Sequence, residues 1–447
     1  MKIAFVSLGC DKNLVDSEIM LGIIDEEGHT ITDDEKNSDI VIINTCGFIE
    51  EAVSEAIETI LEFAELKKQG FIKQIIVTGC MAQRFKGEVF KEIPEVDAVI
   101  GSGDFDAIGK VIKGVSDGEK IILTEGINKK LDNNLAYKRM PATPSYIAYL
   151  KIAEGCDNHC TYCTIPSLRG KYRSRPLESL LHEANILVSK GAAEIVLVAQ
   201  DTSMYGEDLY GVNKLHLLLQ GLSEIEGLKW IRVMYCYPEH ITVESINEIA
   251  SNSKVCKYLD IPIQHASDKI LKLMNRGASK QKIIDVIENL RHQIKGVSLR
   301  TTLIVGFPGE TEDDFNELVQ FVEKIKFDKL GAFAYSKEDG TPAAKLPNQV
   351  DEKEKQKRKR MILETQKIIS AGINKKHIGE TYDVIVDGKL PEEGMYCGRA
   401  YTDAYNTDGA VFFEYGYELL SGAFVKVKIT NALDYDTVGV VIDEFTE

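Results

Sequence analysis

The sequence lacks any long hydrophobic run, because no apolar stretch approaches the ~18–20 residues that a membrane-spanning helix needs. It is also short of positive charge, with 53 Lys and Arg against 70 Asp and Glu for a net charge of −17. Proteins whose whole surface binds nucleic acid are usually basic, so this balance disfavours that class. An acidic surface instead favours a basic partner.

The nine cysteines lack the pairing of a secreted disulfide framework, since they are odd in number and spread over a chain of 447 residues. The apolar run Ile3–Leu8 before Cys10 is too short for the core of a lipoprotein signal. The composition is otherwise ordinary for a globular protein, with 44% hydrophobic and 28% charged residues. We therefore expect a cytoplasmic protein without a membrane segment, in which clustered cysteines serve metal or redox chemistry.

Short runs rich in Val and Ile alternate with helical stretches over residues 1–130. The pattern predicts helices at Asp16–Glu27 and Glu50–Lys67, and buried strands at Ile3–Leu8, Asp39–Asn44, Gln74–Thr78 and Asp97–Ile100. This alternation predicts an N-terminal domain with an open parallel sheet. A linker is predicted over Asn128–Ser145.

The alternation restarts in residues 141–375 and predicts a partial (β/α)6 barrel. Its strands are expected at Tyr146–Ile152, Glu194–Ala199, Trp230–Tyr235, Tyr258–Ile263, Ser298–Val305 and Leu330–Tyr335. A charged helix is expected at Asp351–Gly372, where the run from Lys353 to Arg360 is typical of a solvated face.

Residues 376–447 lose the helical period and predict a small all-β, OB-like barrel. The five expected strands are Tyr382–Asp387, Met395–Tyr401, Gly409–Glu414, Ala423–Thr430 and Thr437–Ile442. The whole chain is therefore predicted to be an α/β protein of three domains.

The first cysteine cluster is C-x3-C-x2-C, formed by Cys156, Cys160 and Cys163. It follows the first strand of the second domain, where a barrel of this type places its catalytic loops. Three thiolates so close together can hold one face of a 4Fe–4S cluster and leave one iron open to substrate. The alternatives are a zinc site, which usually takes a fourth Cys or His, and a dithiol redox pair.

The second cluster consists of cysteines far apart in the sequence, namely Cys10, Cys46 and Cys80. Each lies one or two residues beyond a predicted strand of the N-terminal sheet. Neighbouring strands of a parallel sheet share one carboxyl edge, where ligands bind, so the three thiols are expected to converge. This geometry favours a second iron–sulfur site over inert packing cysteines. Packing is the interpretation for Cys236, Cys256 and Cys397.

The position of C-x3-C-x2-C after the first strand of a six-unit barrel resembles the radical S-adenosylmethionine superfamily. The resemblance implies that the open iron chelates S-adenosylmethionine and that cluster reduction releases a 5′-deoxyadenosyl radical. Cofactor contacts are then implied for Gln200 and Asp201 after the second strand, Gln264 after the fourth, and Arg300 and Gly306 of the fifth. Each of these alone also fits a plain strand-to-helix turn.

Over nearly its whole length the chain resembles the methylthiotransferases, and its last domain is similar to their TRAM domain. The loop Glu338–Ala343 matches the same family. This resemblance implies two 4Fe–4S clusters, one on Cys156, Cys160 and Cys163 and an auxiliary one on Cys10, Cys46 and Cys80. It also implies S-adenosylmethionine in two roles, a sulfur donor and an electron donor protein.

The segments Ser7–Glu18 and Asn44–Ile49 resemble the branch that methylthiolates an aspartate β-carbon on small-subunit ribosomal protein S-twelve, within the ribosomal subunit. The tRNA branch usually reads Gly-Cys-Gln-Met-Asn around its first cysteine. Net charge is −10 over residues 1–140, +2 over 141–375 and −9 over 376–447. An OB-like barrel at −9 repels phosphate and suits a basic protein better. A tRNA adenosine methylthiotransferase and a non-catalytic, metal-stabilised RNA- or ribosome-binding protein are the alternatives.

Overall fold

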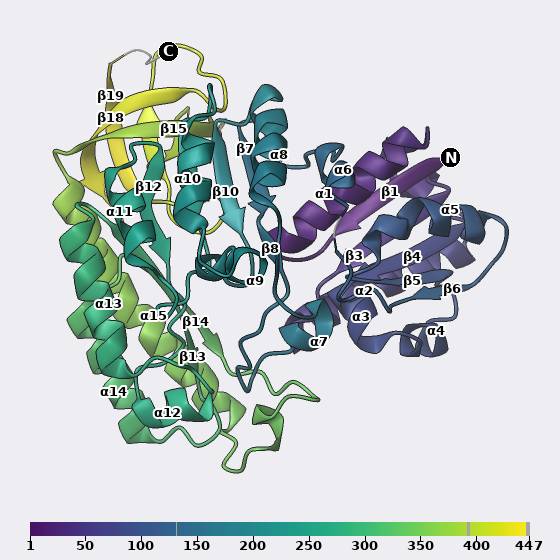
Figure 1. Ribbon diagram of the computed structural model, residues 1–447, viewed down its shortest axis with the longest axis horizontal. Coiled ribbons are helices and arrows are strands. Elements are labelled where there is room, and N and C mark those ends of the chain that lie inside the picture. The colour runs from purple at the N-terminus through teal and green to yellow at the C-terminus, as the bar shows by residue number, and fades with distance from the viewer. Residues whose placement is uncertain (131, 391–393, 444–447) are drawn as a thin grey trace.

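The computed structural model describes residues 1–130, 132–390 and 394–443, and its elements are drawn in Figure 1. It contains two six-stranded parallel sheets and a closed barrel, which confirms the predicted α/β fold class. Residue 131 of the predicted linker, and residues 391–393 and 444–447 of the predicted third domain, lie outside the described residues. Among the described residues, no helix combines the length and the apolar character needed to cross a membrane.

The N-terminal sheet has the strand order β2-β1-β3-β4-β5-β6 and lies on the right in Figure 1. Its strands are β1 (Lys2–Ser7), β2 (Thr30–Thr32), β3 (Ile40–Thr45), β4 (Gln74–Gly79), β5 (Ala98–Gly101) and β6 (Ile121–Leu123). Side chains of α1 (Asp11–Glu26) and α5 (Ile108–Ser116) pack on one face of the sheet. Side chains of α2 (Glu50–Lys68) pack on the other.

Two details of this sheet differ from expectation. Helix α1 begins five residues before the predicted start, because Cys10 occupies the N-cap position and Asp11 supplies an acidic first turn. The strands β2 and β6 were not predicted, since each has only three residues and none of them is fully buried.

The second sheet has the order β14-β13-β12-β11-β10-β7 and stays open, as a partial barrel does. Its strands are β7 (Ile147–Lys151), β10 (Glu194–Val198), β11 (Trp230–Val233), β12 (Val255–Asp260), β13 (Ser298–Val305) and β14 (Lys329–Ala334). The covering helices are α8 (Leu177–Ser189), α10 (Leu215–Ser223), α11 (Val243–Ser251), α13 (Lys280–Gln293), α14 (Glu312–Ile325) and α15 (Glu352–Asn374). Strand β12 is shifted three residues toward the N-terminus from its predicted place.

The charged helix α15 is not simply solvated, which corrects one expectation. Lys355 and Arg358 of its basic run are buried. Arg358 donates to the carboxylate of Glu310 at 2.7 Å, and Glu310 in turn accepts the backbone N–H groups of Gly306 and Phe307. The basic run therefore fixes the loop that follows β13.

The closed barrel has the order β15-β16-β17-β19-β18 and is the yellow unit at the upper left of Figure 1. Its strands are β15 (Thr381–Lys389), β16 (Tyr396–Arg399), β17 (Val411–Glu414), β18 (Phe424–Ala432) and β19 (Thr437–Asp443). The five strands match the five predicted runs to within two residues at most ends. All pairings are antiparallel except the parallel pair of β17 and β19.

One apolar cluster joins the three units. It contains Ile19 of the first sheet's helix, Tyr149 and Trp230 of the second sheet, and Ile385 of the closed barrel. The ring of Trp230 meets Phe424 edge to face at a centroid distance of 4.9 Å. Because the cluster is continuous, the units are fixed relative to one another.

Candidate active site

The contiguous cysteine motif occupies the loop between β8 (Ala153–Glu154) and the short helix α7 (Ile165–Arg169). The loop is closed by backbone hydrogen bonds, from Cys156 to the carbonyl of Gly170 and from Cys163 to that of Cys160, both 3.1 Å. Gly155 has φ +76°, and a Cβ there would collide with the carbonyl of Lys171. Only glycine fits this tight entry to the loop.

Cys156 and Cys160 of the loop are buried, and Cys163 is partly exposed. Burial raises the pKa of Cys156 to about 11 and that of Cys163 to about 12. Charge on Cys160 and Cys156 also raises the pKa of Cys163, so the three sulfurs share one neighbourhood. Cys163 Sγ accepts the N–H of Ile165 at 3.4 Å, a bond that favours the thiolate required for metal binding.

Asp201, a residue predicted to contact the cofactor, supports the loop through a hydrogen bond to Asn158. Its buried carboxylate bonds to Asn158 of the loop at 3.2 Å, to His240 at 2.7 Å and to Ser203. The carboxylate raises the pKa of His240. Both oxygens are thus engaged within the protein, and the geometry makes Asp201 a support for the loop. Its direct contact with the cofactor stays a prediction.

Gln200 and Gln264 carry buried side-chain oxygens without a hydrogen-bond partner among the described residues. Gln200 donates to Glu154 at 3.3 Å, directly before the cysteine loop. Gln264 adopts a left-handed backbone with φ +70° and pairs with Leu303 at the end of β13. Unsatisfied buried acceptors are uncommon, and they suit a polar ligand at this end of the sheet.

Arg300 and Gly306 lie less favourably for a cofactor contact. The Arg300 guanidinium bonds to Asp260 at 3.1 Å and lies 3.4 Å from Asp408 of the closed barrel. Gly306 has φ +71°, and a Cβ there would strike Lys355 of α15. Packing within the protein therefore accounts for both residues, and their cofactor role stays a prediction.

The second set of cysteines follows three adjacent strands, as predicted. Cys10 follows β1, Cys46 follows β3 and Cys80 follows β4, and these strands are hydrogen-bonded neighbours. Charge on Cys10 and on Cys46 raises the pKa of Cys80, which burial brings to about 11. The topology thus brings the three thiols to one carboxyl edge.

Close backbone approach shapes this edge. A Cβ at Gly47 would lie 2.6 Å from the backbone nitrogen of Met81, so the chain after Cys46 runs directly against the chain after Cys80. Within the described residues no three His, Cys, Asp or Glu side chains converge on a single-ion site. Each of the two sets supplies three thiols, the ligand type that an iron–sulfur cluster takes.

Sequence reasoning missed Arg169, the last residue of α7. It is buried between the loop and the N-terminal sheet, and its Nε lies 3.4 Å from Cys80 Sγ. Helix α7 sits between the two units in Figure 1. In the sequence its place six residues after Cys163 was the hint of a role, and its partner Cys80 is 89 positions away.

A cleft of about 360 Å³ opens beside Cys10. All three units line it, with Asp11 from the first, Tyr149 from the second and Tyr405–Thr407 from the third. Tyr149 is also part of the shared apolar cluster. The cleft therefore gives solvent access to Cys10, the first of the strand-end cysteines.

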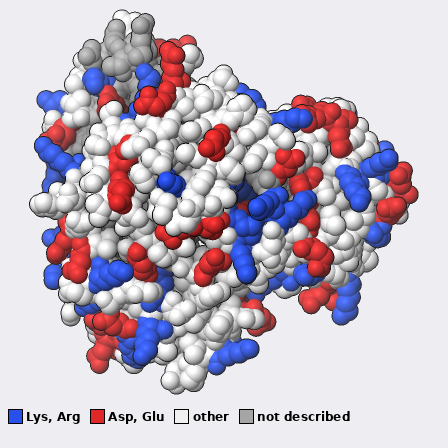
Figure 2. All heavy atoms as spheres, in the orientation of Figure 1, with Lys and Arg blue, Asp and Glu red and all other residues white. Residues whose placement is uncertain are grey.

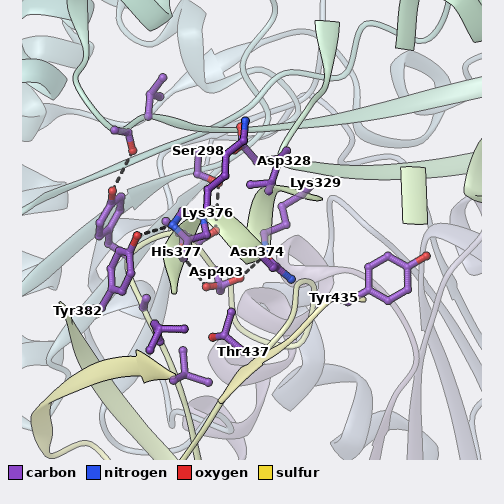
Figure 3. A pocket seen from close by; sticks show the side chains of 18 of the residues that line it. Ser298, Asp328, Lys329, Asn374, Lys376, His377, Tyr382, Asp403, Tyr435 and Thr437 are labelled. Atoms are coloured by element: carbon purple, nitrogen blue, oxygen red, sulfur yellow. Dashed lines mark hydrogen bonds and ion pairs between the residues drawn. The ribbon is translucent and has the colours of Figure 1, made fainter. Parts of the chain in front are cut away.

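A larger cavity of about 510 Å³ lies elsewhere, between the second sheet and the closed barrel (Figure 3). Its polar groups pair with one another, Lys329 with Asp403 and Tyr382 with His377. The cysteines do not line it. We interpret it as part of the joint between these units.

Charged side chains are unevenly spread over the face in Figure 2. Lys and Arg gather where the N-terminal unit meets the second sheet, while acidic side chains are scattered over both flanks. A hollow of about 330 Å³ at this junction is lined by cations and carboxylates together, among them Lys129, Lys130 and Arg173 and the acidic Asp106, Glu154 and Asp208. On this face, Lys and Arg side chains are therefore concentrated at the junction of the N-terminal unit with the second unit, where carboxylates lie among them.

Three protein families match this chain. They are the uncharacterized protein family UPF0004 over residues 2–101, the radical SAM superfamily over 150–322 and the TRAM domain over 378–442. The chain is 50% identical over 444 residues to "Ribosomal protein uS12 methylthiotransferase RimO" of Clostridioides difficile, covering 99% of both chains. It is 50% identical to the protein of the same name from Lachnoclostridium phytofermentans, covering 98% of this chain and 99% of that one.

Among solved structures, the chain resembles the radical S-adenosylmethionine methyltransferase TsrM of Kitasatospora setae. For TsrM with cobalamin and a 4Fe–4S cluster bound, the TM-score is 0.55 and the identity 14%, over 91% of this chain and 81% of that one. Identity at this level shows a shared fold alone.

Proposed function

Since the chain belongs to the RimO family of ribosomal protein uS12 methylthiotransferases, we propose that it methylthiolates the β-carbon of an aspartate on uS12, the small-subunit ribosomal protein S-twelve. The chain is a transferase of the radical SAM superfamily. The observation that carries the proposal is that Arg169 bonds to Cys80 of one three-thiol set and to Glu154, two residues before Cys156 of the other, so that the two sets lie on either side of one interface. One substrate can be reached from both.

We assign the radical-generating cluster to Cys156, Cys160 and Cys163, and the auxiliary cluster to Cys10, Cys46 and Cys80. The donor sets fit, because each supplies three thiols and leaves one iron of a four-iron cluster without a protein ligand. When bound, the first cluster supplies the electron that cleaves S-adenosylmethionine and the second holds the sulfur that is transferred. Burial of Cys80, Cys156 and Cys160 limits the access of water to these three thiols, which protects reactive species.

The residues around the first site then orient the cofactor. Gln200 and Gln264 offer free acceptor oxygens to the ammonium or adenine groups of S-adenosylmethionine. Asp201 positions the loop through Asn158. We retain Arg300 and Gly306 as more remote members of this cofactor shell.

The cleft beside Cys10 is the proposed entrance for the substrate loop. It is lined in part by the closed barrel, whose predicted domain carries a net charge of −9. The barrel residues that line the cleft are uncharged and Asp11 is its acidic lining residue, so the charge complementarity to a basic ribosomal protein comes from Asp11 and from the acidic domain around the cleft. We propose that the reaction takes place in the cytoplasm on the ribosomal subunit, with an electron donor protein. The domains are proposed to span 1–130, 141–375 and 376–447.

The test is an anaerobic incubation of the reconstituted enzyme with S-adenosylmethionine, a sulfur source, reductant and a peptide from the aspartate loop of uS12. We expect the peptide mass to increase by one methylthio group in place of one hydrogen. The matched substrate is tRNA, the target of the alternative function. Modification of tRNA without modification of the peptide would contradict the proposal.

Cysteine variants provide the internal controls. Substitution of Cys10, Cys46 and Cys80 by Ala should abolish product, whereas Cys397→Ser in the closed barrel should leave it unchanged. Full-length identity to uS12 enzymes favours the ribosomal protein over tRNA and over a non-catalytic binding protein. Iron rather than zinc in the purified anaerobic protein would separate the catalytic function from a structural metal site.

A further inference from the structure

Arg169 is an unusual residue for the place where it lies. Its side chain is 2% exposed, and a fully buried guanidinium is stable only when it is paired. It ends α7, the helix that follows the contiguous cysteine loop, yet it points into the N-terminal unit. The hydrogen-bond partners of Arg169 therefore show how the N-terminal unit and the cysteine loop are connected.

The guanidinium has four partners. Its Nη1 donates to Asp16 of α1 at 2.9 Å and to Glu154 at 3.0 Å. Its Nη2 donates to Asn13, and its Nε lies 3.4 Å from Cys80 Sγ. Two carboxylates fix the charge, while one N–H is left for the sulfur.

A second cation completes the network. Lys151 of β7 bonds to Asp16 and, at 2.7 Å, to Glu154. Two carboxylates and two cations balance, so the network itself carries no net charge. The Cys80 thiolate then adds one negative charge that faces Arg169. Burial raises the pKa of the Cys80 thiol, and the charge of Arg169 partly offsets that increase.

The same network reaches the other cluster site. Glu154 immediately precedes Gly155 and Cys156, and its other oxygen accepts from Gln200 at 3.3 Å. A continuous path therefore runs from Cys80 through Arg169 and Glu154 to Gln200. Each link is a hydrogen bond or ion pair of 3.4 Å or less.

We propose that Arg169 is a positioning residue that sets the reduction potential of the auxiliary cluster and ties its ligand Cys80 to the radical-generating loop. The proposal rests on the proposed function, because it assumes a cluster on Cys10, Cys46 and Cys80. Hydrogen bonds to cluster sulfurs and a nearby positive charge both stabilise the reduced cluster, which has the more negative charge. Arg169 supplies both from a single buried side chain.

The experiment is an anaerobic redox titration of the full chain loaded with both clusters, followed by electron paramagnetic resonance. The variant with Cys156, Cys160 and Cys163 changed to Ala keeps only the auxiliary site and identifies its signal. We expect Arg169→Met to lower the auxiliary potential by at least a tenfold change in the electron-binding equilibrium, about 59 mV for one electron. Arg169→Lys keeps the charge but not the planar fork, so a smaller shift in the same direction is expected.

The matched control is Arg139→Met. Arg139 is equally buried between units and forms ion pairs with two carboxylates, Glu18 at 3.4 Å and Glu183 at 3.2 Å, while its Nη2 donates to the carbonyl of Tyr149. Among the described residues no sulfur accepts a hydrogen bond from Arg139. Loss of Arg139 should weaken the contact between the N-terminal unit and the second unit, and should leave the reduction potential of the auxiliary cluster unchanged. An unchanged potential in Arg169→Met, or an equal shift in Arg139→Met, overturns the inference.

Two further outcomes remain distinguishable. If Arg169→Met does not fold, Arg169→Lys decides, and an unchanged potential in that variant overturns the inference. If the variant without Cys156, Cys160 and Cys163 shows neither iron nor a cluster signal, the auxiliary site itself fails. That result overturns the proposed function first and the role of Arg169 with it.

Discussion

The two cysteine sites differ in how the chain builds them. Residues 156–163 form a single loop that local backbone bonds and Gly155 hold closed. Cys10, Cys46 and Cys80 span 71 positions of the sequence and meet only because β1, β3 and β4 are parallel neighbours. The first site depends on local structure and the second on the tertiary fold, although Arg169 bonds both to Cys80 of the second and to Glu154, two residues before Cys156 of the first.

The largest expected effect comes from removing either set of thiols. With Cys156, Cys160 and Cys163 changed to Ala, cleavage of S-adenosylmethionine should be lost completely. With Cys10, Cys46 and Cys80 changed to Ala, cleavage should persist while peptide methylthiolation is lost. Iron analysis should fall from about eight to about four per chain in each case. Cleavage that survives the first triple substitution would show that the assignment of the sites is reversed or wrong.

The next effect tests the dependence of the strand-end site on tertiary contacts. Asp16→Ala removes one of the two carboxylates that the buried Lys151 and Arg169 share and leaves only Glu154 to pair both cations, so it should lower the free energy of unfolding by about 3–5 kcal/mol. Denaturant unfolding followed by circular dichroism measures it. The matched control is Lys73→Ala, which breaks an exposed ion pair with Asp39 and should change it by at most ~1 kcal/mol. Equal losses in both variants would contradict the role of the network.

A third prediction compares the thiols themselves in iron-free protein. Burial raises the pKa of Cys80 to about 11 and that of Cys163 to about 12. At pH 8 only about one molecule in a thousand carries the Cys80 thiolate, so alkylation should be slow and should rise about tenfold per pH unit. Mass spectrometry after iodoacetamide treatment measures the rate at each residue. A rate that does not change with pH would contradict burial of these thiols.

The smallest effect concerns support of the contiguous loop. Hydrogen bonding to Asp201 raises the pKa of His240 in the folded protein. The charged pair therefore stabilises the fold fully below the unfolded His pKa of about 6.5, and the contribution is lost as pH rises through the raised pKa. The free energy of unfolding of the wild type should exceed that of His240→Gln by about 1 kcal/mol at about pH 5.5, and the two should be almost equal at high pH. Denaturation midpoints at the two pH values test this, and a larger gain at high pH would contradict it.

Much of the fold could be predicted from the sequence because buried parallel strands leave continuous runs of Val and Ile. Strand β13 begins and ends at the predicted residues, and the order of the six strands follows the order of the runs. The cysteines after β1, β3 and β4 were placed by topology alone. The resemblance to methylthiotransferases, which the relatives confirm, rests on motifs of six to twelve residues such as Ser7–Glu18 and Asn44–Ile49. The strand pattern and the strand-end cysteines did not depend on those motifs.

What could not be predicted lies between elements distant in the sequence. Arg169 looks like an ordinary helix-terminal arginine until Asp16 and Cys80 are brought beside it. Arg358 looks solvated until α15 docks on Glu310. A charged residue in the sequence does not show whether its side chain is buried, because buried and exposed ion pairs are formed by the same residue types.

The apolar cluster shared by the three units also has a consequence for biosynthesis. Tyr149 and Trp230 are made long before Phe424 and Ile385, the residues that cover them in the closed barrel. During translation the growing chain therefore exposes part of its inner apolar face until the last strands leave the ribosome. Such exposed surface invites aggregation. A chain shortened before the closed barrel would keep that face permanently open, so the last unit acts as the closing piece of the fold.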